Sequence, residues 1–188
     1  MTETELYEKL GKVKLVAMDV DGTYTSGVLM YDSHGEIIKG FHSHDGLALE
    51  LLRLAGIKRG FITGRSDNAT RARGEYLDVD FHLDNISDKS TALTKLFAKY
   101  NITDDESLYI GDDLNDLAAF ETAGICIAVA NAVPEIKLLA DYVTKAPGGS
   151  GAIREVVAMI LRARNIDPVE LWKTGTGKVG NSRRKPLR

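Results

Sequence analysis

Two aspartates separated by one residue, Asp19 and Asp21, are the side chains in this sequence with the clearest chemical potential. They lie in the run LVAMDVDGT, whose apolar first half is typical of a buried strand. Because residues i and i+2 of a strand point to the same side, both carboxylates are expected to face one site at the end of that strand. There, one carboxylate can act as a nucleophile while the other transfers a proton.

Polar residues also follow later strands of the predicted fold. Thr63 lies in FITGR, Lys89 begins a predicted helix after LDNISD, and Asp112 and Asp113, with Asp116 one turn on, follow LYIGDD. Carboxylates that converge on one cleft repel one another unless a cation joins them, and oxygen ligands suit Mg²⁺. A carboxylate nucleophile, a lysine, a hydroxyl and Mg²⁺ together suit phosphoryl transfer.

Each of these short motifs is weak by itself. Paired aspartates often cap helices or bind a structural cation, a threonine after a strand is usually a turn residue, and a lysine is usually solvated. Here the motifs occur together, in order, at successive strand ends. Their joint occurrence favours a catalytic site over the structural alternatives.

The elements that must position these residues are predicted by alternating patterns. Short apolar runs alternate with amphipathic stretches, which indicates an α/β fold with a parallel central sheet and helices on both faces. Ligands of such sheets bind outside the carboxyl ends of the strands. The predicted strands are Val13–Val20, Arg59–Thr63, Val79–Leu83, Ser107–Ile110, Ile125–Val129 and Tyr142–Thr144, and the predicted helices are Asp45–Leu54, Asn68–Tyr76, Lys89–Tyr100, Leu114–Thr122, Pro134–Leu139 and Ala152–Arg164. Two further runs, Val28–Tyr31 and Glu36–Phe41, flank AspSerHisGly and predict a hairpin.

Length and composition limit the classes of protein. The 188 residues, 44% of them hydrophobic, suit one domain, predicted over residues 1–172. Residues 173–188 carry six basic and no acidic side chains and are predicted to be a disordered tail. The rest of the chain has a net charge of −9, which argues against a nucleic-acid partner. The single Cys126, and the lack of a signal-like or membrane-spanning segment, predict a cytoplasmic protein without a membrane partner.

The motifs DVDGT, ITGR, Asp88-Lys89 and GDDLND, taken in this order, resemble the four motifs of the haloacid dehalogenase-like phosphatase superfamily. The resemblance covers about residues 15–160 and implies a three-layer Rossmann-like fold. It implies that Asp19 is the nucleophile and that Asp21 is the general acid and base. A phosphorylated receiver domain also has an aspartate beside Mg²⁺, but its acidic pair comes early and its lysine last. The motifs of this sequence do not follow that order.

The same resemblance implies the remaining roles at the site. Thr63 and Lys89 would hold phosphoryl oxygens. Asp19, Asp112 and the backbone carbonyl of Asp21 would bind Mg²⁺, and Asp113 and Asp116 would orient these ligands. The gaps between the motifs leave no room for a cap domain, so a neighbouring subunit is expected to shape the site. The hairpin at about residues 27–41 is the candidate assembly surface, because its apolar side chains would be a poor monomer surface.

Two segments resemble a subfamily, the 3-deoxy-D-manno-octulosonate 8-phosphate phosphatases. These are FHSHDGLALELL and APGGSGAIREV. The resemblance implies a homotetramer in which the loop Gly148–Gly151 of one subunit approaches the active site of another. It also implies a sugar-acid phosphate as the substrate. The implied substrate-binding residues are Asp21, His42, Ser43, His44, Asp45, Gly46, Arg65, Arg73 and Lys89.

The sequence departs from this subfamily at two positions. His44 and Glu50 replace arginines that would face the anionic substrate, and a carboxylate in place of a guanidinium opposes an anion. One alternative is therefore a related substrate, the 9-phosphate of a nonulosonic acid such as a sialic acid. Another is a non-catalytic assembly domain, like the phosphatase-like domains fused to nucleotide-sugar synthases. The complete set of motifs argues against the second alternative.

Overall fold

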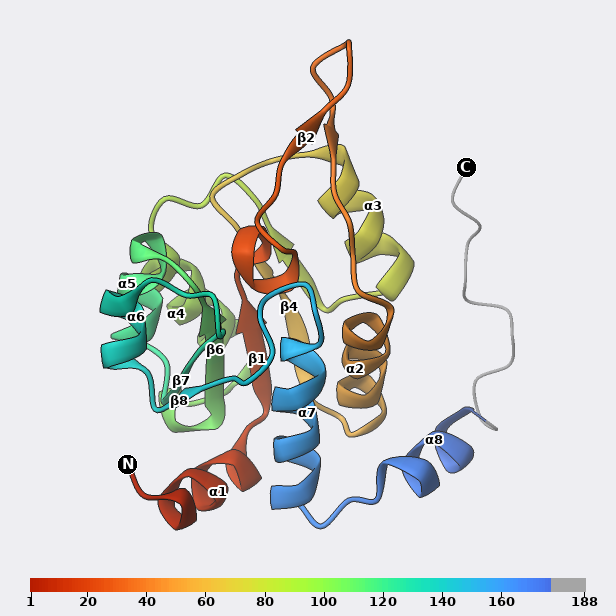
Figure 1. Cartoon of the computed structure of the whole chain (residues 1–188). Helices are drawn as coiled ribbons and strands as arrows, with labels where there is room; N and C mark the ends of the chain where they lie inside the picture. Colours follow the sequence, from red (N-terminus) through yellow and green to blue (C-terminus); the bar gives the residue numbers. More distant parts are fainter. Residues whose placement is uncertain (177–188) are drawn as a thin grey trace.

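A six-stranded parallel sheet forms the centre of the computed structural model, which describes residues 1–176 (Figure 1). Its strand order is β5-β4-β1-β6-β7-β8. The order reverses between β1 and β6, and such a reversal opens a crevice at the carboxyl ends of the strands. The strands are β1 (Leu15–Met18), β4 (Lys58–Ile62), β5 (Phe81–Leu83), β6 (Ser107–Gly111), β7 (Ile125–Ala128) and β8 (Tyr142–Val143).

The first strand lies in the middle of the sheet because its side chains are apolar on both faces. All four residues of β1 are buried, and β1 pairs in parallel with β4 on one side and β6 on the other. The strand is shorter than the predicted Val13–Val20. Asp19 follows it directly, so the carboxylate emerges at the reversal point of the sheet.

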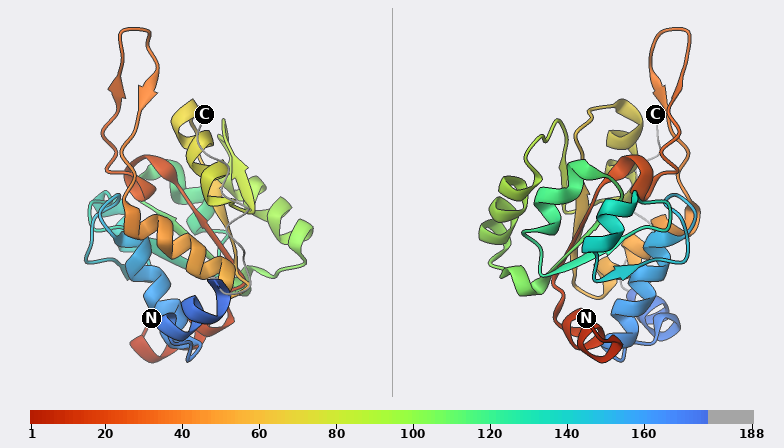
Figure 2. Two further views of the ribbon diagram at one scale, coloured as in Figure 1. Left: turned by 90° about the vertical axis from the view of Figure 1, so that its right-hand side faces the viewer. Right: turned by 60° about the vertical axis from the view of Figure 1, so that its left-hand side comes forward.

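Helices cover both faces of the sheet, as predicted (Figures 1 and 2). On one face α7 packs against α1 and α2, and on the other α4 packs against α5. The alternation of strands and helices therefore gives the expected three layers. The helices are α1 (Glu3–Lys12), α2 (Ser43–Leu54), α3 (Asn68–Leu77), α4 (Lys89–Tyr100), α5 (Leu117–Phe120), α6 (Pro134–Leu139), α7 (Ala152–Ala163) and α8 (Pro168–Thr176).

Two terminal helices, α1 and α8, were missing from the predicted elements. Helix α1 begins with a capping box, in which the Thr2 side chain accepts from the backbone N–H of Glu5 while the Glu5 side chain accepts from that of Thr2. Helix α8 runs through Lys173 to Thr176, so the predicted tail starts too early. The rest of the predicted tail, residues 177–188, lies outside the described residues.

A two-stranded antiparallel hairpin stands away from the body beyond the carboxyl ends of the sheet strands (Figure 2). Its strands, β2 (Met30–Tyr31) and β3 (Ile37–Ile38), are shorter than predicted. Val28, Met30 and Ile38 are exposed. Within the described residues, the segment between β1 and β4 adds only this hairpin and α2 to a short helical turn, and that between β4 and β5 only α3. The fold has no cap domain there.

No helix in the part of the chain that the structure describes combines the length and the apolar character that a membrane span requires.

Candidate active site

The carboxylate of Asp19 lies buried at the end of β1, beside the ammonium group of Lys89. The Lys89 Nζ is 2.9 Å from Asp19 Oδ1 and 2.6 Å from Asp116 Oδ1. Lys89 is the first residue of α4, and Asp88 caps that helix by accepting a hydrogen bond from the Thr91 N–H. The capped helix start thus brings a buried lysine to the end of a neighbouring sheet strand.

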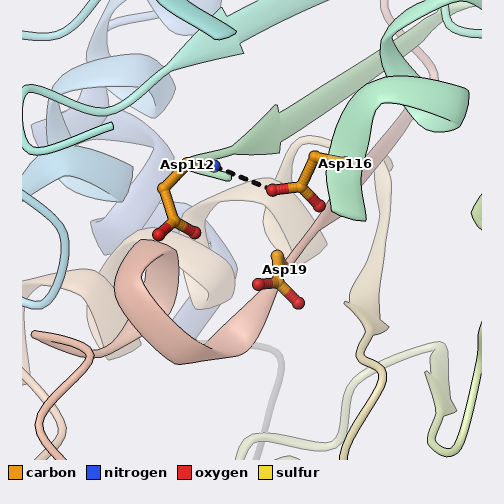
Figure 3. A group of neighbouring side chains, drawn as sticks. All are labelled: Asp19, Asp112 and Asp116. Carbon is orange, nitrogen blue, oxygen red and sulfur yellow. Dashed lines mark hydrogen bonds between the residues drawn. The ribbon is translucent and has the colours of Figure 1, made fainter. Parts of the chain in front are cut away.

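Asp116 has hydrogen-bond partners on both carboxylate oxygens. Oδ1 accepts from the Tyr109 hydroxyl at 2.7 Å, and Oδ2 accepts from the backbone N–H of Asp112 at 2.8 Å (Figure 3). The pKa of Tyr109 lies well above its usual value, chiefly because the side chain is buried. Its hydroxyl therefore keeps its proton and acts as a donor. With Lys89 also on Oδ1, Asp116 is placed to orient the site, the role expected for it.

Asp112 faces Asp19 from the end of β6. Its Oδ1 accepts a hydrogen bond from the Thr23 hydroxyl at 2.8 Å. Burial, opposed by the hydrogen bond from Thr23 and reinforced by the neighbouring carboxylates Asp19, Asp116 and Asp113, raises the pKa of Asp112 to about 7. Burial likewise raises the pKa of Asp19 to about 6, with Lys89 opposing it. The three carboxylates Asp19, Asp112 and Asp116 therefore outnumber the one lysine, Lys89, that contacts this group.

One carboxylate oxygen each from Asp19, Asp112 and Asp116 lies within 4.8 Å of the others (Figure 3). Oxygen ligands at this spacing suit Mg²⁺. Because the oxygens of Asp116 already have donors, Asp19 and Asp112 are the side chains left to hold the ion. Asp113 is exposed and caps the following turn, where its Oδ1 accepts from the backbone N–H of Leu114.

A tight turn, Val20–Tyr24, connects β1 to the hairpin. Gly22 has a φ of +97°, and a Cβ at this position would lie 2.0 Å from Asp112 Oδ2. Only glycine fits such a position. The glycine of DVDGT therefore lets the turn pass directly beside Asp112.

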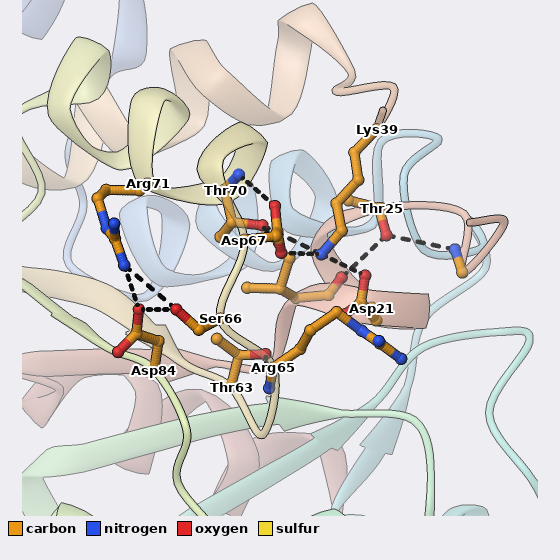
Figure 4. A network of polar contacts seen from close by, with 12 residues as sticks. Asp21, Thr25, Lys39, Thr63, Arg65, Ser66, Asp67, Thr70, Arg71 and Asp84 are labelled. Atoms are coloured by element: carbon orange, nitrogen blue, oxygen red, sulfur yellow. Dashed lines mark hydrogen bonds and ion pairs between the residues drawn. The ribbon is translucent and has the colours of Figure 1, made fainter. Parts of the chain in front are cut away.

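The side chain of Asp21 lies on the other side of this turn, with two cations (Figure 4). Lys39 Nζ is 2.7 Å from Asp21 Oδ1, and Arg65 Nε is 3.4 Å from Oδ2. The ammonium of Lys39 also donates to Asp67 Oδ2 at 2.7 Å. Burial disfavours the charged form of Asp67, but the hydrogen bonds from Lys39 and Thr70 outweigh it and lower the pKa of Asp67.

An open cleft of about 730 Å³ lies in front of these residues. Asp19, Asp21, Thr63 and Arg65 line it from the β1 and β4 sides, and Asp113 lines it after β6. Thr63 follows β4, and its hydroxyl accepts from the backbone N–H of Arg65 at 3.2 Å. The structure thus gathers the predicted nucleophile, acid/base residue and phosphate-binding hydroxyl around one cleft.

The predicted substrate-binding residues at the start of α2 do not line the cleft. Asp45 is completely buried, and its two oxygens accept from the backbone N–H groups of Gly151 and Arg154, at the start of α7. Gly46 is covered by the Arg73 guanidinium, which lies 2.3 Å from where a Cβ would be. Both residues are used in packing α2, and a substrate-binding role for Asp45 and Gly46 stays a prediction.

The other α2 residues lie outside the cleft lining. His42 precedes α2, its ring packs edge-on against that of His44 at 5.1 Å, and Ser43 and His44 are exposed. Glu50, further along the helix, accepts two hydrogen bonds from Arg53. His42, Ser43 and His44 stay predictions as substrate ligands.

Arg73 is half-buried in an aromatic setting. Its Nε donates to the Tyr24 hydroxyl at 3.3 Å, and its guanidinium lies over the rings of Phe41 and Tyr76. Arg65, by contrast, lines the cleft with 43% of its side chain exposed. Of the two arginines predicted to bind the anion, Arg65 is the one placed to meet it.

The glycine-rich loop Gly148–Gly151, before α7, packs against the turn Val20–Tyr24 of its own chain. A Cβ on Gly148 would lie 1.9 Å from the carbonyl oxygen of Gly22, and Gly149 donates its N–H to the Thr23 carbonyl oxygen. Asn131 joins the two segments, because it donates to the Gly22 carbonyl and accepts from the Gly148 N–H. The loop therefore supports the turn that carries Asp21.

Four residues at the site were absent from the sequence prediction. Thr23 lies inside the DVDGT motif and could have been inferred from it. Tyr109 lies in the strand just before GDDLND. Because alternate residues of a strand point to the same face, its side chain could have been expected near the motif. Lys39 and Asn131 carry no local signal, because their partners lie far away in the sequence.

Comparison with known proteins agrees with this geometry. A family model described as haloacid dehalogenase-like hydrolase matches residues 65–155. A 3-deoxy-D-manno-octulosonate 8-phosphate phosphatase from Haemophilus influenzae is 39% identical over 159 residues, which are 85% of this chain and 88% of that protein. The corresponding phosphatase from Escherichia coli K12 is 33% identical, and the match covers 85% of each chain.

Solved structures give the same result. A HAD superfamily (subfamily III A) structure from Legionella pneumophila has a TM-score of 0.88 and 40% identity, covering 94% of this chain and 96% of that one. The Moraxella catarrhalis 3-deoxy-D-manno-octulosonate 8-phosphate phosphatase, solved with magnesium, phosphate and KDO, has a TM-score of 0.87 and 39% identity. The match covers 92% of this chain and 99% of that one.

Proposed function

The chain belongs to the haloacid dehalogenase-like hydrolase family, and on that premise we propose that it is a Mg²⁺-dependent phosphatase of 3-deoxy-D-manno-octulosonate 8-phosphate. The products are 3-deoxy-D-manno-octulosonate and inorganic phosphate. The observation that carries the substrate is the 39% identity, over 85% of this chain, with the Haemophilus enzyme named for that substrate. The nonulosonic acid 9-phosphate and the non-catalytic alternative have no comparable support.

In the proposed reaction the two aspartates have different roles. An Asp19 oxygen attacks phosphorus, the bond from phosphorus to the sugar oxygen breaks, and an aspartyl-phosphate forms. Asp21 gives a proton to the leaving sugar oxygen. Asp21 then takes a proton from water, which attacks the aspartyl-phosphate and releases phosphate. Thr63 and Lys89 hold the phosphoryl oxygens during both steps.

The carboxylates of Asp19 and Asp112, with the backbone carbonyl of Asp21, would hold Mg²⁺. When bound, Mg²⁺ neutralises the charge that gathers on the phosphoryl oxygens. The donor set fits this ion because it consists of oxygen atoms in a buried site where carboxylates outnumber the one lysine, Lys89. Arg65, at the exposed side of the cleft, is placed to bind the substrate's anionic groups.

A substrate panel tests this function. We would measure kcat/KM with Mg²⁺ for the octulosonate 8-phosphate, a nonulosonic acid 9-phosphate and p-nitrophenyl phosphate, because discrimination between substrates is expressed in that ratio. Of the two sugar-acid phosphates, we expect the 8-phosphate to have the higher kcat/KM. A preference for the 9-phosphate would overturn the substrate, and no phosphate release from any of the three would overturn the enzyme class.

We further propose that the chain acts as a homotetramer in the cytoplasm. The support is the apolar surface of the hairpin, where Val28, Met30 and Ile38 are 63%, 50% and 51% exposed. In this assembly the hairpin contacts another subunit, and the loop Gly148–Gly151 of a neighbour lies near the cleft. Analytical ultracentrifugation should give a tetramer, and Ile38→Glu should shift it to smaller species. A wild-type chain that sediments only as a monomer would contradict the assembly.

A further inference from the structure

Lys39 is a buried lysine at the base of the hairpin, directly after β3. Its side chain is 1% exposed, which is unusual for a lysine unless it is paired. Three oxygen atoms surround its Nζ: Asp21 Oδ1 and Asp67 Oδ2 at 2.7 Å, and the Thr70 hydroxyl at 3.1 Å (Figure 4). Asp67 Oδ2 and the Thr70 hydroxyl accept hydrogen bonds from Nζ, whereas Asp21 Oδ1 forms an ion pair with it.

The partners of Lys39 come from two separate parts of the fold. Asp21 belongs to the catalytic turn, while Asp67 and Thr70 belong to the start of α3. Asp67 caps α3, since its Oδ1 accepts from the Thr70 backbone N–H at 2.8 Å. The ammonium therefore has a fixed anchor on one side and the side chain of Asp21 on the other.

The arrangement leaves one oxygen of Asp21 for the substrate. Oδ1 is taken by Lys39, whereas Oδ2 lies 3.4 Å from the exposed Arg65 at the cleft. Without Lys39, the nearest remaining cation is Arg65, and the carboxylate is free to turn toward it. An acid/base group that has turned out of line loses much of its effect, because proton transfer requires hydrogen-bond distance to the leaving oxygen.

We propose that Lys39 is a positioning residue, which anchors Asp21 to the start of α3 so that Asp21 can protonate the leaving oxygen. The inference rests on the proposed phosphatase function and adds to it a residue outside the four sequence motifs. It also links the hairpin to the acid/base residue, because Lys39 belongs to the descending arm of the hairpin.

The test uses leaving groups that differ in their need for an acid. Nitrophenolate leaves without protonation, whereas the sugar alcohol of the 8-phosphate requires it. We would measure kcat/KM with p-nitrophenyl phosphate and with the 8-phosphate, since kcat/KM covers only the steps through departure of the leaving group. The variants are Lys39→Met, which keeps an apolar stem, and Lys39→Arg, which restores the charge. Lys58→Met is the matched control, because Lys58 pairs with Asp80 at the opposite end of β4.

We expect Lys39→Met to lower kcat/KM for the 8-phosphate by about 10- to 100-fold, at the lower end of what general acid catalysis contributes. The aryl phosphate should lose less than about threefold, and Lys39→Arg should recover part of the loss. Lys58→Met should leave both values within about twofold. Equal losses for both substrates, or no loss for either, would overturn the positioning role.

A folding failure has its own control. If circular dichroism shows that Lys39→Met does not fold, Lys39→Gln replaces it, with the same selective loss expected and the same result overturning the inference. A wild-type chain that releases phosphate from neither substrate would overturn the proposed function, and this inference with it. A wild-type chain that hydrolyses the aryl phosphate and the 9-phosphate, but not the 8-phosphate, would change only the substrate, and the 9-phosphate would then serve as the alkyl substrate.

Discussion

The two aspartates of the DVDGT motif are held by different parts of the molecule. Asp19 contacts Lys89, whose other partner is Asp116 after β6, so its surroundings come from the ends of the sheet and the helices that cover it. Asp21 contacts Lys39, which belongs to the hairpin and is anchored at α3. Each aspartate thus has its own buried lysine and its own second carboxylate, but only the set around Asp19 lies at the ends of the sheet strands and the helices that follow them.

This difference separates two tasks of the site. The Asp19 side collects carboxylates and must be balanced by cations, since burial raises the pKa of Asp19 to about 6 and that of Asp112 to about 7. The Asp21 side already pairs its carboxylates with Lys39 and Arg65. Under the proposed function, the first side balances phosphoryl charge and the second holds one proton-transfer group in place.

The largest expected effect is that of Asp19→Asn. The nucleophile is needed for every substrate, so kcat/KM should fall by at least about 10⁴-fold with both the aryl and the alkyl phosphate. Phosphate release with Mg²⁺ present measures the effect, and circular dichroism checks the fold. Activity within about 100-fold of the wild type would contradict the nucleophile role.

Lys89→Met comes next and contrasts directly with Lys39→Met. In the proposed reaction Lys89 holds phosphoryl oxygens rather than the leaving oxygen, so we expect both substrates to lose about 10²- to 10³-fold in kcat/KM. The variant also leaves Asp19 and Asp116 without their shared cation, and loss of one partner of a buried pair costs about 3–5 kcal/mol of unfolding free energy. Chemical denaturation without Mg²⁺ measures that cost, with Lys58→Met as the control. A loss confined to the alkyl phosphate would reverse the comparison of the two lysines.

Gly148→Ala tests the support that both sides share. A Cβ there would lie 1.9 Å from the Gly22 carbonyl oxygen, so the turn carrying Asp21 has to shift. A displacement of this kind should lower kcat/KM by about 10-fold for both substrates. Gly40→Ala is the matched control, because a Cβ at Gly40 has nothing within 4 Å. If the two variants behave alike, the loop does not support the turn.

The smallest expected effect is a pH dependence of thermal stability. Without Mg²⁺, Asp19 and Asp112 have a pKa above the usual 3.8 in the folded state. The folded chain therefore binds more protons than the unfolded chain between about pH 4 and 7, and its unfolding free energy falls as pH rises through that window. Mg²⁺ binds the ionised carboxylates, so it should raise Tm by a few degrees more at pH 8 than at pH 5.

A fluorescence melt with EDTA or Mg²⁺ at both pH values measures this difference. Asp112→Asn should reduce it. A Mg²⁺ shift that is equal at the two pH values, or larger at pH 5, would contradict the carboxylate site on the Asp19 side.

The parallel sheet and the Asp19 side were predictable from sequence because their signals are local. Asp19, Thr63, Lys89 and Asp112 each follow or begin a regular element, and the ends of parallel strands meet at one edge. The start of α2 was not predictable in this way. Asp45 has the type and position of a ligand residue, but only the tertiary structure shows that both its oxygens accept hydrogen bonds from the start of α7.

The sequence by itself determined the α/β layers and the group of Asp19, Thr63, Lys89 and Asp112 at the strand ends, because strand period and short motifs fix which side chains leave the sheet at its carboxyl end. Only the tertiary structure decided which residues surround Asp21. Lys39, Asp67 and Gly148 come from a hairpin, a helix start and a distant loop, and their approach depends on packing between segments far apart in the chain. Local sequence patterns do not predict such contacts, because each contact joins segments that are distant in the sequence.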